Sequence, residues 1–295
     1  MITVPELVSQ VKSGSFRELA RALTIIENDL EGSRELLKSL KKSSSPIIGI
    51  TGPPGAGKST LVNAMINHWS QNGKSIAVLA VDPTSPFNLG SLLGDRIRMA
   101  EQFTKRNVFI RSIATRGSLG GLSGKTIEMT DLLQAAGFDY ILVETVGVGQ
   151  SEVEIAGLAD LSVVVLVPES GDEIQNIKSG LMEIADIFVV NKSDREGSDT
   201  FANNLKNLVL QKSTKIPVLK TSANRAEGIN DLIKAIEDHP YSSNIRKPFL
   251  LAEKAWKLVQ QARMKNIDKN KLQKDLSRLY DDPEFNLYSF VDSLI

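Results

Sequence analysis

The feature that most constrains the fold is a glycine-rich segment between an apolar run and a helical pattern. It fits GxxxxGK[ST], follows the run Ile47–Ile50, and precedes an apolar series with helical spacing that begins at Leu61. Backbone N–H groups in such a loop converge on phosphates, and the following helix N-terminus favours an anion. The chain is therefore expected to bind a nucleotide, through Gly52, Pro53, Pro54, Gly55, Ala56, Gly57, Lys58, Ser59 and Thr60.

Short β-branched runs alternate with helical patterns between residues 46 and 240. Several runs are nearly continuous in Ile, Val and Leu, as expected for strands buried on both faces. Strands separated by helices predict an α/β fold of the P-loop NTPase type, with a mostly parallel central sheet. The runs are 46–51, 75–81, 107–113, 140–145, 161–168, 187–191 and 217–221.

Helical extensions are expected at both ends of this sheet domain. The first contains Leu19, Leu23, Ile26 and Leu30 at spacings of three and four, and helical spacing returns after Tyr241. We therefore expect an N-terminal helical arm over 1–44, a nucleotide-binding domain over 45–240, and a C-terminal helical arm over 241–295.

Composition excludes several kinds of protein. The chain has 295 residues and no apolar run near the roughly 18 residues that predict a membrane span. Without cysteine it has no disulfide, thiolate metal site or iron–sulfur cluster. Its 35 basic residues balance 35 acidic ones, whereas a nucleic-acid binder carries a basic excess. The N-terminus lacks a signal-peptide pattern, so we expect a cytoplasmic protein that binds neither nucleic acid nor membrane.

A second motif predicts the base of the nucleotide. Asn191, Lys192 and Asp194 form Asn-Lys-x-Asp at the end of an apolar run. A carboxylate there accepts hydrogen bonds from N1–H and the exocyclic amine of guanine, whereas adenine would leave it unpaired. Asn191 is expected at the N7 side and the Lys192 stem against the base. Thr221, Ser222 and Ala223, which close the last run, resemble a loop whose backbone contacts the guanine carbonyl, so we expect GTP and GDP.

Carboxylates at the ends of further strands predict a Mg²⁺ site and switch segments. Asp82 and Glu144 each end a buried run, and Asp95 lies in a polar loop; with the Ser59 hydroxyl they are the expected metal ligands. Lys58, Asp95, Glu144 and Gln150 are the expected catalytic residues, although Gln150 and Asp95 are alternatives for positioning water. The arginines considered as a finger in cis are Arg96, Arg98 and Arg116. We expect slow intrinsic hydrolysis that a partner tunes.

Gly124-Lys125-Thr126 repeats the GKT triplet without the phosphate-loop spacing or a preceding strand. We interpret it as a loop and helix start rather than a second phosphate site.

Taken together, TGPPGAGKST, AVDPTSP, GDRIRM, TRGSLGGLS, VETVGVGQSE, PESGDEIQNIKSG and VVNKSD resemble the MeaB/ArgK-type G proteins of the SIMIBI branch of P-loop GTPases. The resemblance implies a homodimeric GTPase chaperone for an adenosylcobalamin-dependent acyl-CoA mutase, methylmalonyl-CoA mutase. It also implies that residues 169–178 form a third switch facing the mutase. The implied contacts are Asp172, Glu173, Gln175 and Lys178. Lys125 departs from the family pattern, and its role stays open.

Other classes remain as alternatives. A nickel metallochaperone GTPase shares the fold but needs His and Cys ligands, and this chain has two His and no Cys. A signal-recognition-type GTPase needs a Met-rich basic domain, whereas the six Met are scattered. A non-enzymatic dimer with GTP as a structural ligand conflicts with the intact Lys58 and Ser59.

Overall fold

The computed structural model describes residues 3–41, 43–82, 99–114, 124–145, 155–169, 181–210, 216–241, 247–264, 266–280, 282 and 284–294. The chain divides into two compact units, Met1–Leu250 and Leu251–Ile295.

The first unit is built on a seven-stranded sheet with the order β3-β2-β4-β1-β5-β6-β7, in which all neighbouring strands are parallel. This confirms the predicted fold class. The ends of each predicted strand differ from those of the observed strand by at most two residues. The central strand β1 has β4, β2 and β3 on one side and β5, β6 and β7 on the other, so the order in which strands are added reverses at β1. Ligands of open parallel sheets bind at the carboxyl ends of such strands. The strands are β1 (Ile47–Thr51), β2 (Ile76–Asp82), β3 (Val108–Ala114), β4 (Tyr140–Thr145), β5 (Leu161–Leu166), β6 (Ile187–Val190) and β7 (Val218–Lys220).

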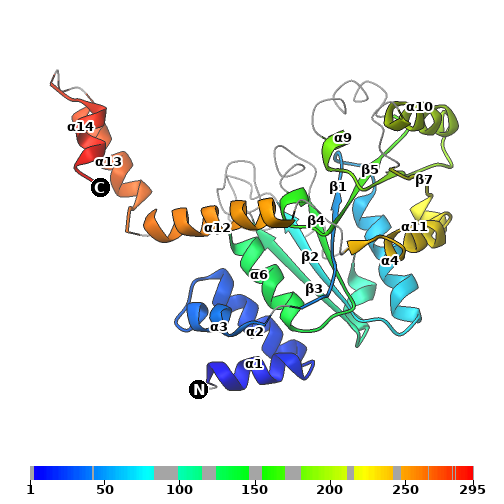
Figure 1. Ribbon diagram of the computed structural model, residues 1–295, viewed down its shortest axis with the longest axis horizontal. Coiled ribbons are helices and arrows are strands. Elements are labelled where there is room, and N and C mark those ends of the chain that lie inside the picture. The colour runs from blue at the N-terminus through cyan, green and yellow to red at the C-terminus, as the bar shows by residue number, and fades with distance from the viewer. Residues whose placement is uncertain are drawn as a thin grey trace. The chain divides into compact units, whose positions relative to one another are not determined.

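Helices cover both faces of the sheet (Figure 1). Alternate strand residues belong to two separate apolar clusters, because successive side chains of a strand point to opposite faces. One cluster includes α1 (Val4–Lys12), α2 (Phe16–Glu27), α3 (Ser33–Ser39), α6 (Gly124–Ala135), α9 (Leu181–Ile184), α10 (Ser198–Leu210) and the 3₁₀ turn η2 (Ile155–Gly157). The other includes α4 (Lys58–Gln71), α11 (Ile229–Glu237) and the turn η4 (Ala223–Arg225), while η1 (Ala100–Thr104) follows its member Met99.

The N-terminal helices pack into the same core as the sheet. Phe16 of α2 contacts Phe109 of β3 edge-on, with ring centroids 5.5 Å apart. An ion pair between Arg111 and Glu27, at 2.5 Å, joins β3 to the end of α2. These residues link the segment 1–44 to the nucleotide-binding unit by both apolar and polar contacts.

One expectation for this segment is wrong. Leu30 does not continue the apolar face of α2, because the helix ends at Glu27 and Leu30 is 49% exposed. Asp29 adopts a left-handed conformation with φ 52°, and the Leu30 N–H donates to the Ile25 carbonyl at 3.0 Å. This is a Schellman-type end, which turns the chain away before Leu30 reaches the core.

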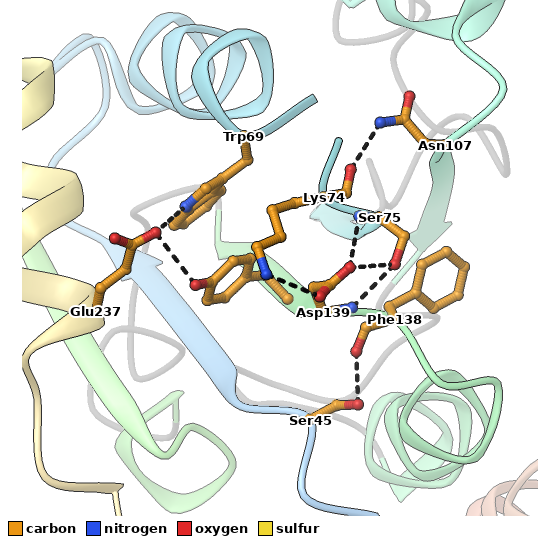
Figure 2. A network of polar contacts seen from close by, with 9 residues as sticks. Ser45, Trp69, Lys74, Ser75, Asn107, Phe138, Asp139 and Glu237 are labelled. Atoms are coloured by element: carbon orange, nitrogen blue, oxygen red, sulfur yellow. Dashed lines mark hydrogen bonds and ion pairs between the residues drawn. The ribbon is translucent and has the colours of Figure 1, made fainter. Parts of the chain in front are cut away.

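Three aspartates accept backbone hydrogen bonds at the amino-terminal ends of the strands. Each precedes a strand and accepts from a backbone N–H at the start of the neighbouring strand: Asp139 from Ser75, Asp160 from Ile47, and Asp186 from Ser162. Figure 2 shows the Asp139 contacts, which include the Ser75 hydroxyl at 2.8 Å and the Lys74 ammonium at 3.4 Å. Burial raises the pKa of Asp139, but these hydrogen bonds and the charge of Lys74 together hold it below its ordinary value.

A second network ties the far end of α4 to the sheet and to α11. Glu237 accepts from the Trp69 indole at 3.0 Å and from the Tyr140 hydroxyl at 3.2 Å. Trp69 and Glu237 are seen in Figure 2, and the Trp69 and Tyr140 rings stack with centroids 4.2 Å apart. Trp69 is only 1% exposed, so the carboxylate satisfies a buried N–H. Burial, followed by the Glu237 charge, raises the pKa of Tyr140 to about 12.

The second unit is helical, and its elements are α12 (Lys247–Met264, which begins in the first unit), α13 (Lys269–Leu279) and α14 (Leu287–Asp292). Large apolar side chains of α12 lie in solvent in the single chain, among them Trp256, which is 61% exposed. No helix in the described part of the chain is long and apolar enough to cross a membrane.

Candidate functional site

The phosphate loop lies between the end of β1 and the start of α4, as the motif predicts. Gly52 has φ 136°, and a Cβ there would lie 2.0 Å from the Val165 carbonyl oxygen of β5. Gly55 and Gly57 also have positive φ, at 76° and 84°. The loop therefore has a backbone that side-chain-bearing residues adopt only with strain. Pro54 and Gly55 are exposed and Pro53 is half-buried, whereas Ala56 is buried.

Lys58 is buried at the first turn of α4 and bends back over the loop. Its ammonium donates to the Gly52 carbonyl at 2.7 Å and to the Pro53 carbonyl at 3.0 Å. The charge is thus held inside the ring of backbone groups expected to surround a phosphate. Thr60 follows in the same turn.

Ser59 in the first turn of α4 meets Glu144 near the carboxyl end of β4. The Ser59 hydroxyl donates to Glu144 Oε1 at 2.7 Å, and both side chains are buried. Two neighbouring oxygen donors, one of them a carboxylate, are the chemistry that Mg²⁺ prefers. Asp82 ends the adjacent strand β2, in which Ala80 lies opposite Glu144. Among the residues that the structure describes, no three His, Asp or Glu side chains gather as a metal cluster.

Asn191 joins the guanine motif to the phosphate loop. Its amide nitrogen donates to the Ala56 carbonyl at 2.9 Å, and its oxygen accepts from the Thr221 hydroxyl at 3.1 Å and the Ala223 N–H at 3.2 Å. Asn191 is 2% exposed. A Cβ on Gly57 would lie 2.5 Å from its Nδ2, so the close approach requires glycine. One buried amide therefore holds three loops together.

Lys192 and Asp194 follow on the surface side of this junction. Lys192 has φ 56°, a conformation rare for a residue with a side chain and frequent at functional sites. Asp194 Oδ1 accepts from the Ser222 hydroxyl at 2.9 Å. That hydrogen bond is the largest of the effects that hold the pKa of Asp194 below its ordinary value, and the charges of Arg225 and Arg195 act in the same direction. The carboxylate is thus ionised and oriented.

The structure brings together the phosphate loop, Ser59, Glu144 and the guanine motif. Several predicted residues lie outside the described part of the chain, and the side chain of Asp82 is likewise not described. They are Asp95, Gln150, Asp172, Glu173, Gln175 and Lys178, together with Arg96, Arg98 and Arg116.

The GKT triplet at 124–126 begins α6 rather than a phosphate loop. The Lys125 ammonium lies 2.8 Å from a Glu128 carboxylate oxygen and 3.3 Å from one of Asp29, so it faces acidic groups and joins α6 to the N-terminal helices.

Sequence reasoning missed Thr51 and Thr145, which shape the site together with Thr221 of the Thr221-Ser222-Ala223 loop. The Thr145 hydroxyl donates to Thr51 Oγ1 at 3.0 Å, directly beneath the phosphate loop, and both are fully buried. Thr221 bonds Asn191 as described. Each of the three is a polar residue at the end of an apolar run, the same signal that identified Asp82 and Glu144.

Comparisons with known proteins agree with this site. A family model described as Methylmalonyl Co-A mutase-associated GTPase MeaB matches residues 19–278. A Pyrococcus horikoshii protein whose name provisionally assigns it as a GTPase is 46% identical over 272 residues, covering 89% of this chain and 83% of the relative. GTPase ArgK of Escherichia coli K12 is 39% identical over 206 residues, covering 68% and 62%.

Two further matches are more distant. The mouse protein named methylmalonic aciduria type A homolog, mitochondrial, is 37% identical over 253 residues, covering 78% of this chain and 61% of the relative. Among solved structures, that of an LAO/AO transport system kinase has a TM-score of 0.70 at 24% identity and covers 100% of this chain and 98% of its own; this likeness concerns the fold.

Proposed function

Since the chain belongs to the MeaB family of methylmalonyl Co-A mutase-associated GTPases, we propose that it is a Mg²⁺-dependent GTPase chaperone of an adenosylcobalamin-dependent acyl-CoA mutase. Its GTP hydrolase activity follows from the family and from relatives named as GTPases. The observation that carries the rest is the family match over 260 residues, 19–278, which includes every element of the site.

In the proposed reaction the phosphate loop binds the β- and γ-phosphates. Lys58 exchanges its bonds with the Gly52 and Pro53 carbonyls for phosphate oxygens, at a position where its charge is already desolvated. Removing this cation leaves the developing phosphate charge without its nearest partner. We expect Lys58→Ala to slow GTP hydrolysis by about 100-fold or more, measured as phosphate release.

Ser59 and Glu144 are the proposed holders of Mg²⁺, with Asp82 and Asp95 as further ligands. The metal neutralises charge on the phosphates when bound. In the chain itself Glu144 Oε1 accepts a hydrogen bond from the Ser59 hydroxyl at 2.7 Å, and this bond would direct the Ser59 lone pairs to the metal. Gln150 and Asp95 remain the proposed residues that position water.

Guanine is the proposed base because Asp194 is held ionised by Ser222 and faces solvent beside the loop that Asn191 closes. Ala223 contributes a backbone N–H next to this position, and Lys192 lies against Gly57 of the phosphate loop. Phosphate and base groups therefore share one junction, as a site for a whole nucleotide requires.

The proposed client contacts are Asp172, Glu173, Gln175 and Lys178, in the loop that follows Glu169. Gel filtration of the chain with purified methylmalonyl-CoA mutase, with GDP or a non-hydrolysable GTP analogue, tests this. We expect co-elution that depends on the nucleotide, and a faster hydrolysis than the chain shows alone. The absence of both co-elution and a change of rate would contradict the client assignment. Intrinsic turnover above ~10 s⁻¹ would contradict the proposed dependence on a partner.

A homodimer through the C-terminal arm is also part of the proposal. Leu251, Trp256 and Val259 are exposed on α12, and at about 100° per residue they fall within an arc of roughly 140° around the helix. Solvent-exposed apolar stripes of this kind are typical of helices that pack against a partner. Truncation after residue 245 is expected to leave a monomer that binds GTP. Full-length Trp256→Glu should weaken the dimer in sedimentation, while the exposed Tyr288→Glu serves as control. An intact dimer in the truncated chain would contradict the assignment.

A cytoplasmic location is also part of the proposal. Fractionation of cells with an antibody to the chain tests it.

A further inference from the structure

Asp194, the carboxylate expected to bind guanine, has two arginine neighbours, one in the sequence and one in space. Arg195 follows it in the chain, but its guanidinium pairs with Glu169 at the end of the β5 segment. Hydrogen bonding from Arg195 holds the pKa of Glu169 below its ordinary value. Arg225 comes from η4, and its Nη2 lies 3.5 Å from Asp194 Oδ2. The two arginines thus have different carboxylate partners.

The backbone around Arg225 is fixed by its own hydrogen bonds. The Arg225 N–H donates to the Ser222 carbonyl at 2.9 Å. Ser222 and Glu227 exchange two backbone bonds, at 3.1 and 3.2 Å, which close the loop between them. Gly228 then passes so near β7 that a Cβ would lie 2.1 Å from the Lys220 carbonyl oxygen. The guanidinium therefore extends from a rigid loop, although its side chain is 60% exposed.

Each oxygen of the Asp194 carboxylate has its own neighbour. Oδ1 accepts from the Ser222 hydroxyl at 2.9 Å, and Oδ2 faces Arg225. Guanine offers two donors, N1–H and the 2-amino group, and a carboxylate receives both only when its plane is held in the plane of the base. Without Arg225, the carboxylate has one side-chain anchor, Ser222, besides its own backbone N–H, and its plane is held less firmly. With Arg225 it has two.

We propose that Arg225 is a positioning residue for guanine selection, which orients the Asp194 carboxylate so that both of its oxygens meet the base. This role adds to the GTPase activity of the chain and is independent of the client assignment. The effect of Arg225 on nucleotide affinity should depend on the number of donors on the base, which distinguishes this role from a general contribution of Arg225 to stability.

Hypoxanthine provides the matched ligand, because it keeps N1–H and lacks the 2-amino group. Arg225→Gln is expected to weaken GDP binding by about two- to fivefold, the range of an exposed ion pair. IDP, which needs one carboxylate oxygen, should lose little affinity. The ratio of GDP to IDP affinity should therefore fall by about the same factor.

The experiment is calorimetric titration of the full chain with GDP and with IDP. Arg195→Gln is the matched control, since it removes the same charge from the residue next to Asp194 and should leave the ratio unchanged. Arg225→Lys keeps a cation and should restore most of the ratio. An unchanged ratio in Arg225→Gln, an equal fall in Arg195→Gln, tighter GDP binding, or no restoration by lysine would each overturn the proposal. Thermal unfolding within about 2 °C of wild type shows that the variants are folded.

Discussion

Replacing Asn191 by alanine tests whether one buried amide unites the phosphate and base loops. The change removes the bonds to the Ala56 carbonyl, the Thr221 hydroxyl and the Ala223 N–H, at 2.9, 3.1 and 3.2 Å. Each buried hydrogen bond contributes about 1 kcal/mol net, so the junction loses about 3 kcal/mol. If the loops separate in the free protein, nucleotide binding must order them again. We then expect GDP affinity to fall by about 100-fold.

Thr221→Val gives a graded second variant, because valine matches the shape of this fully buried threonine and lacks its hydroxyl. It removes one bond to Asn191 and touches no expected base contact, so GDP affinity should fall by about fivefold. Calorimetric titration with GDP, together with urea unfolding without nucleotide, measures both effects.

Two results would refute this reasoning. If Asn191→Ala loses stability but binds GDP like wild type, the junction supports the fold and not the site. If Asn191→Ala loses 100-fold while Thr221→Val loses nothing, the effect comes from a direct contact of Asn191 with the base.

Three further predictions concern the frame around the site. Gly52→Ala should lower the free energy of unfolding by about 3 kcal/mol, because the new Cβ would overlap the Val165 carbonyl oxygen. Gly55→Ala, also at positive φ but with open space around the Cβ, should cost about 1 kcal/mol, and equal losses of the two variants in urea unfolding would contradict the clash. Glu237→Ala leaves the buried Trp69 indole without its acceptor and should lower the free energy of unfolding by about 2 kcal/mol, while Glu237→Gln keeps an oxygen and should lower it less. Trp69 fluorescence in a Trp256→Phe background reports unfolding, and equal losses of stability in the two variants would count against the network. The pKa of Asp139 is lowered in the folded state, so its contribution to stability is present above the unfolded pKa and is lost as the pH falls through the folded pKa. The stability difference between wild type and Asp139→Asn, about 1 kcal/mol at most at pH 6, should therefore shrink between pH 5 and pH 3. A difference that stays constant over this range would contradict the prediction.

Local sequence patterns predicted the strands of this protein but not its tertiary contacts. The β-branched runs predicted the seven strands because strands buried on both faces need continuous apolar side chains over a few residues. Leu30 shows the limit of such patterns, since the end of α2 depends on a left-handed Asp29 that spacing does not reveal. The Trp69 and Glu237 pair, 168 residues apart, likewise has no signature in either segment.

The sequence by itself determined the parallel sheet, the phosphate loop and the guanine motif, because each depends on residues adjacent in the chain. Only the tertiary structure decided that Asn191 bonds Ala56 across 135 residues, that Arg225 rather than Arg195 faces Asp194, and that Lys125 pairs with acids of the N-terminal helices. The Asn191 and Arg225 contacts join loops from different strands, and the distance between such loops depends on the order β4-β1-β5-β6-β7 in the sheet. That order is a property of how helices cover the two faces, and no single segment contains it.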